Sequence, residues 1–264
     1  MYIEKFKVEL NDLKYRFYQS PVEKIFAKIR SSAFPRIETS DEIAKELKRY
    51  LDLAGKYCDF SWDLDGPALY RARKNDYDQF KEFPPSEMGA PDANLASDGR
   101  AQPAGVSLLY VADTVPTAIA EVRPEIGEYV TIGEFRIKSG YRLKVLDLTR
   151  FHAPNNCDKD IFCLIDLSRR AFSGSVHPKD PKKYYAHQYF VQMVRDLSYD
   201  GIGYESAVNQ GGRCFAFFDA KGFECEKTLL YQVNSVSVIS TKVEFSSMEK
   251  EYLAQQDAEI QRNK

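Results

Sequence analysis

Residues 99–124, GRAQPAGVSLLYVADTVPTAIAEVRP, run from a basic loop through an apolar stretch into a short amphipathic segment. The apolar residues 106–112 predict a buried strand, and the residues after it predict a helix that ends near Glu121. Arg100, Tyr110 and Glu121 therefore come from a loop, a strand and a helix that follow one another directly. A guanidinium, a phenol and a carboxylate that converge suit a ligand with phosphate, a flat ring and a ribose hydroxyl, as in a dinucleotide.

Composition and charge set broad limits on the class of protein. The chain has 264 residues, 44% of them hydrophobic and 29% charged, with a formal net charge of −2. This near-neutral balance gives no electrostatic footprint for nucleic acid, and no apolar run is long enough to span a membrane. The opening MYIEKFKVEL lacks the apolar segment of a signal peptide, and five cysteines at irregular spacing favour a reduced, cytoplasmic protein.

Missing motifs exclude several kinds of site. His152, Cys157 and Cys163 can be drawn as metal ligands, but no C-x-x-C or H-x-x-x-H pair accompanies them, so we expect no metal. The chain contains neither G-x-G-x-x-G nor G-x-x-x-x-G-K-[ST], which argues against a Rossmann cofactor site and a nucleoside-triphosphate loop. A G-x-S-x-G elbow is also missing, which argues against a Ser–His hydrolase.

Hydrophobic spacing divides the chain into three parts. Residues 1–60 are predicted to be a helical region, residues 61–240 the main domain, and residues 241–264 a polar C-terminal helix or tail. Two roles stay open for the N-terminal helices: packing on the main domain, or a module for partner binding or for dimerisation into a homodimer. Within the main domain, residues 74–105 are rich in proline and glycine and show no periodicity, which predicts a lid or a pocket wall.

The main domain is predicted to be α+β, with a mixed or antiparallel sheet and inserted helices. Its half-buried and buried patterns predict strands over residues 68–73, 106–112, 129–137, 143–148, 201–205, 214–218 and 229–239, and helices over 116–122, 161–172 and 184–197.

Two arginines on the first of these strands are candidate phosphate ligands. Arg71 and Arg73 are two residues apart, so a strand places them on one face, where two guanidinium groups can grip a diphosphate. The alternative for both is a solvated face or an internal salt bridge. An arginine between apolar neighbours is costly to bury without an anion, which favours the ligand role for Arg71.

Glu121, Tyr110 and Ser206 are the other candidates, and each has a structural alternative. Glu121 lies among small and apolar residues, so it either points into a cleft or lies on the exposed edge of a helix. Tyr110 fits a ligand pocket or the core. Ser206 follows a strand and precedes a glycine-rich turn, where a hydroxyl can face a ligand, although many serines end strands without a function.

Six motifs in order resemble the RES domain, the toxin half of a class of bacterial toxin–antitoxin pairs. The resemblance spans about residues 68–219 and rests on Y-R at 70–71, the G-R loop at 99–105, L-Y at 109–110, T-A-x-x-E-V at 117–122, D-G-I-x-Y-x-S at 200–206 and an aromatic strand ending in aspartate at 215–219. The family loop carries asparagine where this chain has Gln102. An aromatic often follows the first arginine, where this chain has Ala72.

The resemblance implies a fold similar to ADP-ribosyltransferases and an enzyme that degrades NAD+, as a glycohydrolase or a phosphorylase. NAD+ would be the substrate, with no further cofactor, and an Xre-type antitoxin would be the protein partner. Arg71 would hold phosphate. Tyr110 would pack on the nicotinamide side, and Glu121 and Ser206 would position the ribose. The alternatives are a mono-ADP-ribosyltransferase that modifies a macromolecule, or a degenerate nucleotide-binding module.

Overall fold

An eight-stranded sheet forms the centre of the described part of this chain. The structure is a computed structural model that describes residues 45, 48–49, 51–53, 55–56, 59–62, 66–150, 172 and 185–237. The chain divides into a unit Met1–Val233 and a second unit, Asn234–Lys264. The described strands of the first unit are β1 (Asp59–Trp62), β2 (Leu69–Lys74), β3 (Leu109–Ala112), β4 (Tyr129–Ile137), β5 (Leu143–Asp147), β6 (Gly201–Glu205), β7 (Arg213–Phe217) and β8 (Phe223–Gln232).

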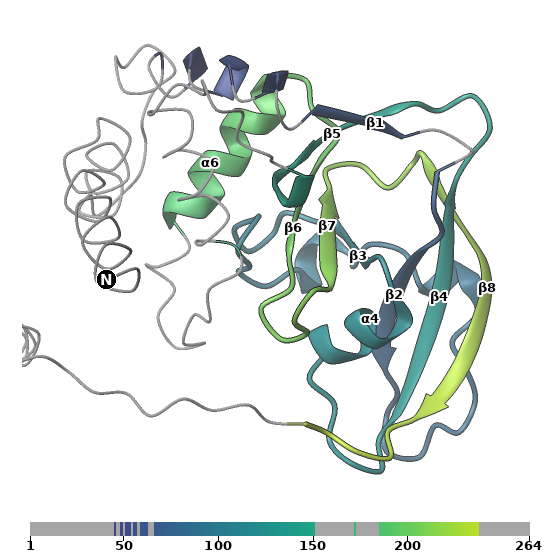
Figure 1. Ribbon diagram of the computed structural model, residues 1–264. Coiled ribbons are helices and arrows are strands. Elements are labelled where there is room, and N and C mark those ends of the chain that lie inside the picture. Colours follow the sequence, from purple (N-terminus) through teal and green to yellow (C-terminus); the bar gives the residue numbers. More distant parts are fainter. Residues whose placement is uncertain are drawn as a thin grey trace, which may run out of the picture. The chain divides into compact units, whose positions relative to one another are not determined.

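The eight described strands form a mixed sheet in the order β1-β5-β6-β7-β3-β2-β4-β8 (Figure 1). Only β5 and β6 pair in parallel, and the other described neighbours are antiparallel. The helices described over their full length are α4 (Val115–Glu121) and α6 (Tyr185–Asp196), with short 3-10 turns η1 (Pro85–Glu87), η2 (Ala93–Leu95) and η3 (Leu148–Arg150). The α+β class with a mixed sheet is therefore confirmed.

The sheet opens at its centre, between β2 and β3. These strands pair at one position, Tyr70 with Ala112, whereas β2 pairs with β4 over six positions and β3 with β7 over four. Beyond Tyr70, the Arg71 side chain replaces a strand-to-strand bond, because its Nη1 donates to the Tyr110 carbonyl at 3.2 Å. Beyond Tyr70, a side chain therefore bridges β2 and β3 in place of the backbone ladder.

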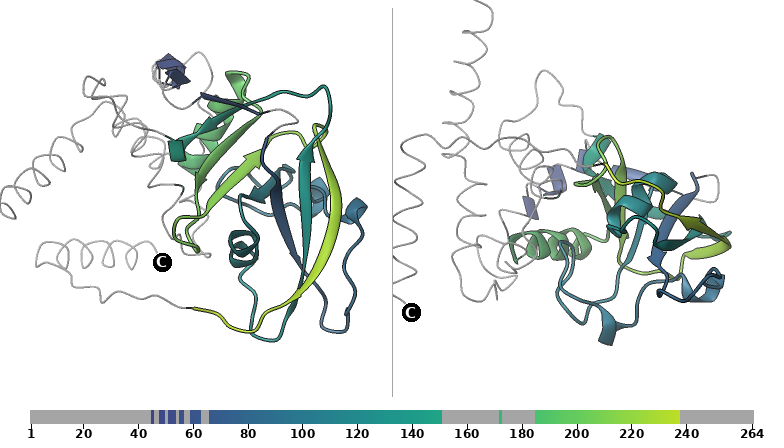
Figure 2. Two further views of the ribbon diagram at one scale, coloured as in Figure 1. Left: turned by 45° about the vertical axis from the view of Figure 1, so that its right-hand side comes forward. Right: turned by 90° about the horizontal axis from the view of Figure 1, so that it is seen from below.

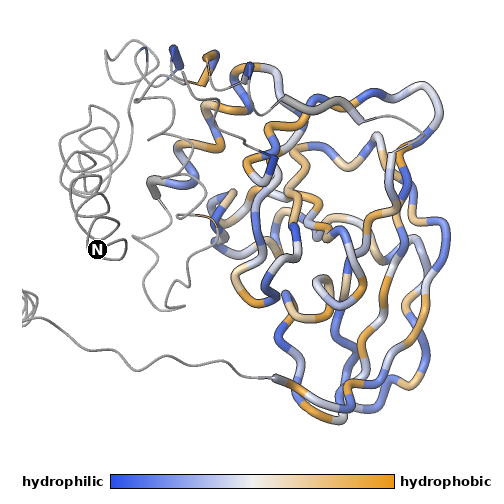
Figure 3. The backbone as a smooth tube through the Cα atoms, viewed as in Figure 1, coloured by the Kyte–Doolittle hydropathy of each residue, from blue (hydrophilic) through white to orange (hydrophobic). Residues whose placement is uncertain are grey.

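Apolar side chains cover both faces of the sheet. One face buries a cluster around Trp62, Phe135, Phe215 and Phe217. On the other face, α6 packs beside β6, and α4 packs beside β2, β3 and β4 (Figures 1 and 2). Hydrophobic segments follow the strands, while β8 mixes hydrophilic and hydrophobic residues (Figure 3) and buries only Phe223, as is typical of an exposed edge strand.

Most predicted elements of the main domain are confirmed, with small shifts at their ends. β4 and β6 have the predicted bounds, α4 and α6 match their predicted helices within a residue, and β3 begins three residues late. The strand predicted at 229–239 is wrong in position, because β8 runs from Phe223 to Gln232 and residues 233–237 are not a strand. The first half of β8, FECEKT, is not predicted as a strand because it is polar. It belongs to an edge strand that exposes many side chains.

The predicted helical N-terminal region lies mostly outside the described residues. The residues described between 45 and 56 are helical, whereas β1 begins at Asp59, inside the region predicted to be helical. The predicted helix 161–172, apart from Phe172, and the C-terminal helix or tail predicted at 241–264 also lie outside the described residues. The three-part division of the chain stays a prediction.

Candidate active site

A cavity of about 620 Å³ lies at the opening between β2 and β3. Its walls come from these two strands, from α4, from the turn after β6 and from the loop around residues 91–102. A pocket of this volume lies in the range of small-molecule and cofactor sites. The cavity collects four of the predicted site residues, together with a buried cysteine: Arg71, Arg100, Tyr110, Glu121 and Cys214.

Glu121 and Ser206 meet at one edge of this cavity. Ser206 Oγ donates to Glu121 Oε1 at 2.7 Å. The same oxygen of Ser206 accepts from the backbone N–H groups of Val208 at 3.2 Å and Asn209 at 3.0 Å. A serine hydroxyl has one proton and two lone pairs, so all its hydrogen-bonding capacity is used. Ser206 is buried and is not among the residues that line the cavity, so it reaches the cavity through Glu121.

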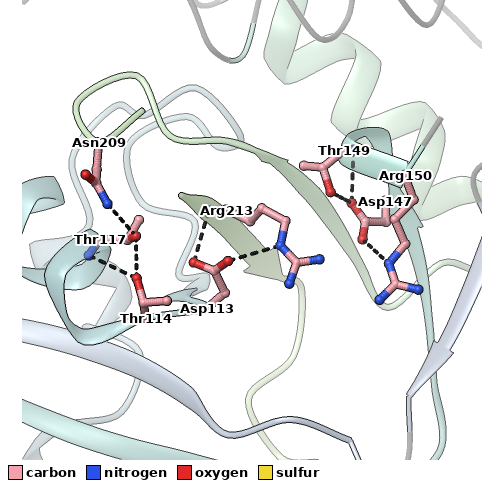
Figure 4. Close-up of polar contacts among 8 residues, drawn as sticks. All are labelled: Asp113, Thr114, Thr117, Asp147, Thr149, Arg150, Asn209 and Arg213. Atoms are coloured by element: carbon pink, nitrogen blue, oxygen red, sulfur yellow. Dashed lines mark hydrogen bonds and ion pairs between the residues drawn. The ribbon is translucent and has the colours of Figure 1, made fainter. Parts of the chain in front are cut away.

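Local sequence brings α4 and the β6–β7 turn into contact. Thr114 caps α4 by accepting from the Thr117 N–H, and Pro116 follows in the first turn, both favourable at a helix start. Fully buried Thr117 accepts from Asn209 Nδ2 at 2.8 Å (Figure 4). A Cβ on Gly212 would lie 2.3 Å from Thr117 Oγ1, so only glycine permits this approach.

Arg71 lines the cavity and also holds a buried donor that has no partner among the described residues. Its Nη1 binds the Tyr110 carbonyl, but its buried Nε has no hydrogen-bond partner among the described residues. Burial, with the nearby charge of Arg73, lowers the pKa of Arg71. A guanidinium with a buried, unused donor is unfavourable unless an anion completes it. The geometry therefore favours an anionic ligand group at Arg71.

The loop that carries Arg100 is fastened from α6. Gln188 Nε2 donates to the carbonyl oxygens of Gly99 at 2.9 Å and Gln102 at 3.0 Å, and Arg100 itself donates to the Phe172 carbonyl. These contacts hold the loop as a wall of the cavity, as the sequence predicted for residues 74–105.

Gln102 fixes the ring of Tyr110. The Tyr110 hydroxyl donates to Gln102 Oε1, and burial raises the pKa of Tyr110 above its usual value, so the phenol stays neutral. Gln102 is itself buried and its Nε2 lies 3.4 Å from the Ser97 carbonyl. The residue that departs from the family asparagine thus orients a residue of the cavity.

Arg73 is not brought to the cavity. Its guanidinium stacks on Phe83, 3.8 Å from the ring centroid, and lies 3.6 Å from the Glu87 carboxylate. A strand places both arginines on one face, but the exposed Arg73 side chain turns toward η1, where its Nη1 donates to the Glu87 carbonyl at 3.1 Å. Sequence reasoning also missed Gln188 and Cys214 as neighbours of the site, since a lone glutamine in a helix and a cysteine in an apolar strand give no signal.

Metal ligands and membrane-spanning segments are not found in the part of the chain that the structure describes. Among these residues, no three His, Cys, Asp or Glu side chains are placed to hold a metal ion, and His152, Cys157 and Cys163 lie outside them. None of the described helices is long and apolar enough to cross a membrane.

Comparison with known proteins identifies a family. A model described as the RES domain matches residues 68–237. The solved structures that match include a chain of the M. tuberculosis MbcT–MbcA toxin–antitoxin complex, at 13% identity and a TM-score of 0.41, covering 73% of this chain and 93% of that one. No curated protein gives a significant match.

Proposed function

Because the chain belongs to the RES domain family, we propose that it is a toxin that consumes NAD+ by cleaving the bond between nicotinamide and ribose. The observation that carries the proposal is the pairing of Glu121 with Ser206 at the edge of a cavity that also holds Arg71 and Arg100. A carboxylate beside two guanidinium groups suits a ligand with a developing positive charge at one end and phosphate at the other.

Cleavage of this bond needs no general acid. The C1′–N bond breaks with its electron pair moving to the nicotinamide nitrogen, which neutralises the pyridinium, so the leaving group needs no proton. Positive charge then spreads over the ribose in an oxocarbenium-like state. In this proposal Glu121 stabilises that charge, Arg71 and Arg100 hold the diphosphate, and Tyr110 packs beside nicotinamide. Water would complete hydrolysis by adding a hydroxyl to C1′ and releasing a proton, and inorganic phosphate would complete phosphorolysis.

Replacement of Glu121 by Gln tests the proposal. Purified wild-type protein is expected to release nicotinamide from NAD+, and Glu121→Gln to lose on the order of a hundredfold or more of the rate, because a preorganised charge is removed. Circular dichroism and a urea titration serve as controls for the fold. Wild-type protein that leaves NAD+ intact, or a variant as fast as wild type, would refute the proposal.

The products separate the alternatives. Free ADP-ribose indicates hydrolysis and ADP-ribose 1″-phosphate indicates phosphorolysis, whereas label retained on a protein or nucleic acid indicates a mono-ADP-ribosyltransferase. An Xre-type antitoxin is the proposed partner. Its co-expression should restore both growth and the cellular NAD+ level.

A further inference from the structure

Glu121 has an unfavourable position for a carboxylate. It is the last residue of α4, where the helix carries its partial negative charge and repels an anion. A carboxylate there needs hydrogen-bond donors to hold one orientation. Ser206 supplies one of them.

A second donor comes from the central strand β7. Cys214 Sγ lies 3.2 Å from Glu121 Oε1, the same oxygen that Ser206 binds. Cys214 is buried at 3% exposure and lines the cavity. Burial and the adjacent Glu121 charge raise the pKa of the Cys214 thiol. The thiol therefore stays protonated and is the donor in the hydrogen bond to Glu121, since a carboxylate can only accept.

We propose that Cys214 is a positioning residue for Glu121. Its thiol and the Ser206 hydroxyl both bind Oε1, while Oε2 takes no hydrogen bond from the part of the chain that the structure describes. The two donors thereby fix the rotation of the carboxylate and reserve Oε2 for the ribose. This role rests on the proposed NAD+ cleavage.

The chemical link between Cys214 and Glu121 can be measured without turnover. The infrared S–H stretching band of Cys214 is isolated as the difference between wild type and Cys214→Ala, which removes the contribution of the other four cysteines. In Glu121→Ala the acceptor is gone, so the band should move to the frequency of a thiol with a weaker hydrogen bond. A band that stays in place would overturn the contact.

Kinetics then test the role. Cys214→Ala should lower kcat on the order of fivefold, the effect of one lost hydrogen bond, with KM changed less than about twofold. Cys214→Ser keeps a donor at this position and should restore most of the rate, whereas a purely packing role would leave the serine variant no better than alanine. Urea titrations of both variants control for folding.

The outcomes separate the two proposals. Wild-type protein that consumes no NAD+ would refute the proposed function, and with it the catalytic consequence of the contact, while the infrared band still decides whether the contact exists. Active wild type with an unchanged kcat in Cys214→Ala would overturn the positioning role alone.

Discussion

Arg71 and Arg73 are separated by one residue on β2, yet the structure gives them different partners. Arg71 lines the cavity with a buried, unused Nε, whereas Arg73 is exposed beside Phe83 and Glu87. We expect Arg71→Ala to weaken NAD+ binding by about 10- to 100-fold, the loss of one or two hydrogen bonds to a charged group. Isothermal titration in the Glu121→Gln background measures the dissociation constant without turnover.

Arg73→Ala is the matched control at the residue scale. It removes the same charge two positions away and leaves the cavity wall in place, so affinity should change less than about threefold, because exposed ion pairs contribute little. Equal losses in the two variants would show that the arginines act through the general electrostatic potential, and would contradict a specific phosphate contact at Arg71.

At the scale of elements, the site depends on how α4 meets the β6–β7 turn. Thr117→Val keeps the shape of the side chain but leaves Asn209 Nδ2 without its acceptor. We expect a loss of about 1–3 kcal/mol in the free energy of unfolding. We also expect kcat to fall. Glu121 lies on α4 and Ser206 on the β6–β7 turn, and loss of the Thr117–Asn209 hydrogen bond lets these two segments move apart. Urea denaturation and nicotinamide release measure the two effects.

Thr149→Val is the control for Thr117→Val and distinguishes a loss of stability from a loss of activity. Thr149 Oγ1 donates to fully buried Asp147 at 2.6 Å, a threonine hydroxyl contact away from α4 and the β6–β7 turn (Figure 4). Its loss should destabilise the fold while leaving kcat near the wild-type value. If Thr117→Val lowers only stability, α4 does not need this anchor to present Glu121.

The elements also show what the sequence could predict and what it could not. Alternation of apolar and polar residues predicted β4 and β5, because this signal is local. Motif resemblance selected Arg71, Arg100, Tyr110 and Glu121, which the structure places around one cavity. The sequence could not indicate that Arg73 turns away to Phe83 and Glu87, or that Ser206 uses all its hydrogen bonds behind Glu121, because both depend on contacts between distant segments.

At the scale of the whole unit Met1–Val233, the cavity joins elements on both sides of the opening in the sheet. Residues from β2, β3, α4 and β7 line it, and α6 holds its loop wall, so a bound ligand ties the two sides together. NAD+ at a hundred times its dissociation constant should stabilise Glu121→Gln by about 2.7 kcal/mol, which raises Tm by about 5–10 °C. Differential scanning fluorimetry measures the shift. Nicotinamide, which lacks the phosphates, should give a much smaller shift, and Arg71→Ala in the same background should reduce the NAD+ shift. Identical shifts with NAD+ and nicotinamide would mean that the arginine side of the cavity does not bind the dinucleotide.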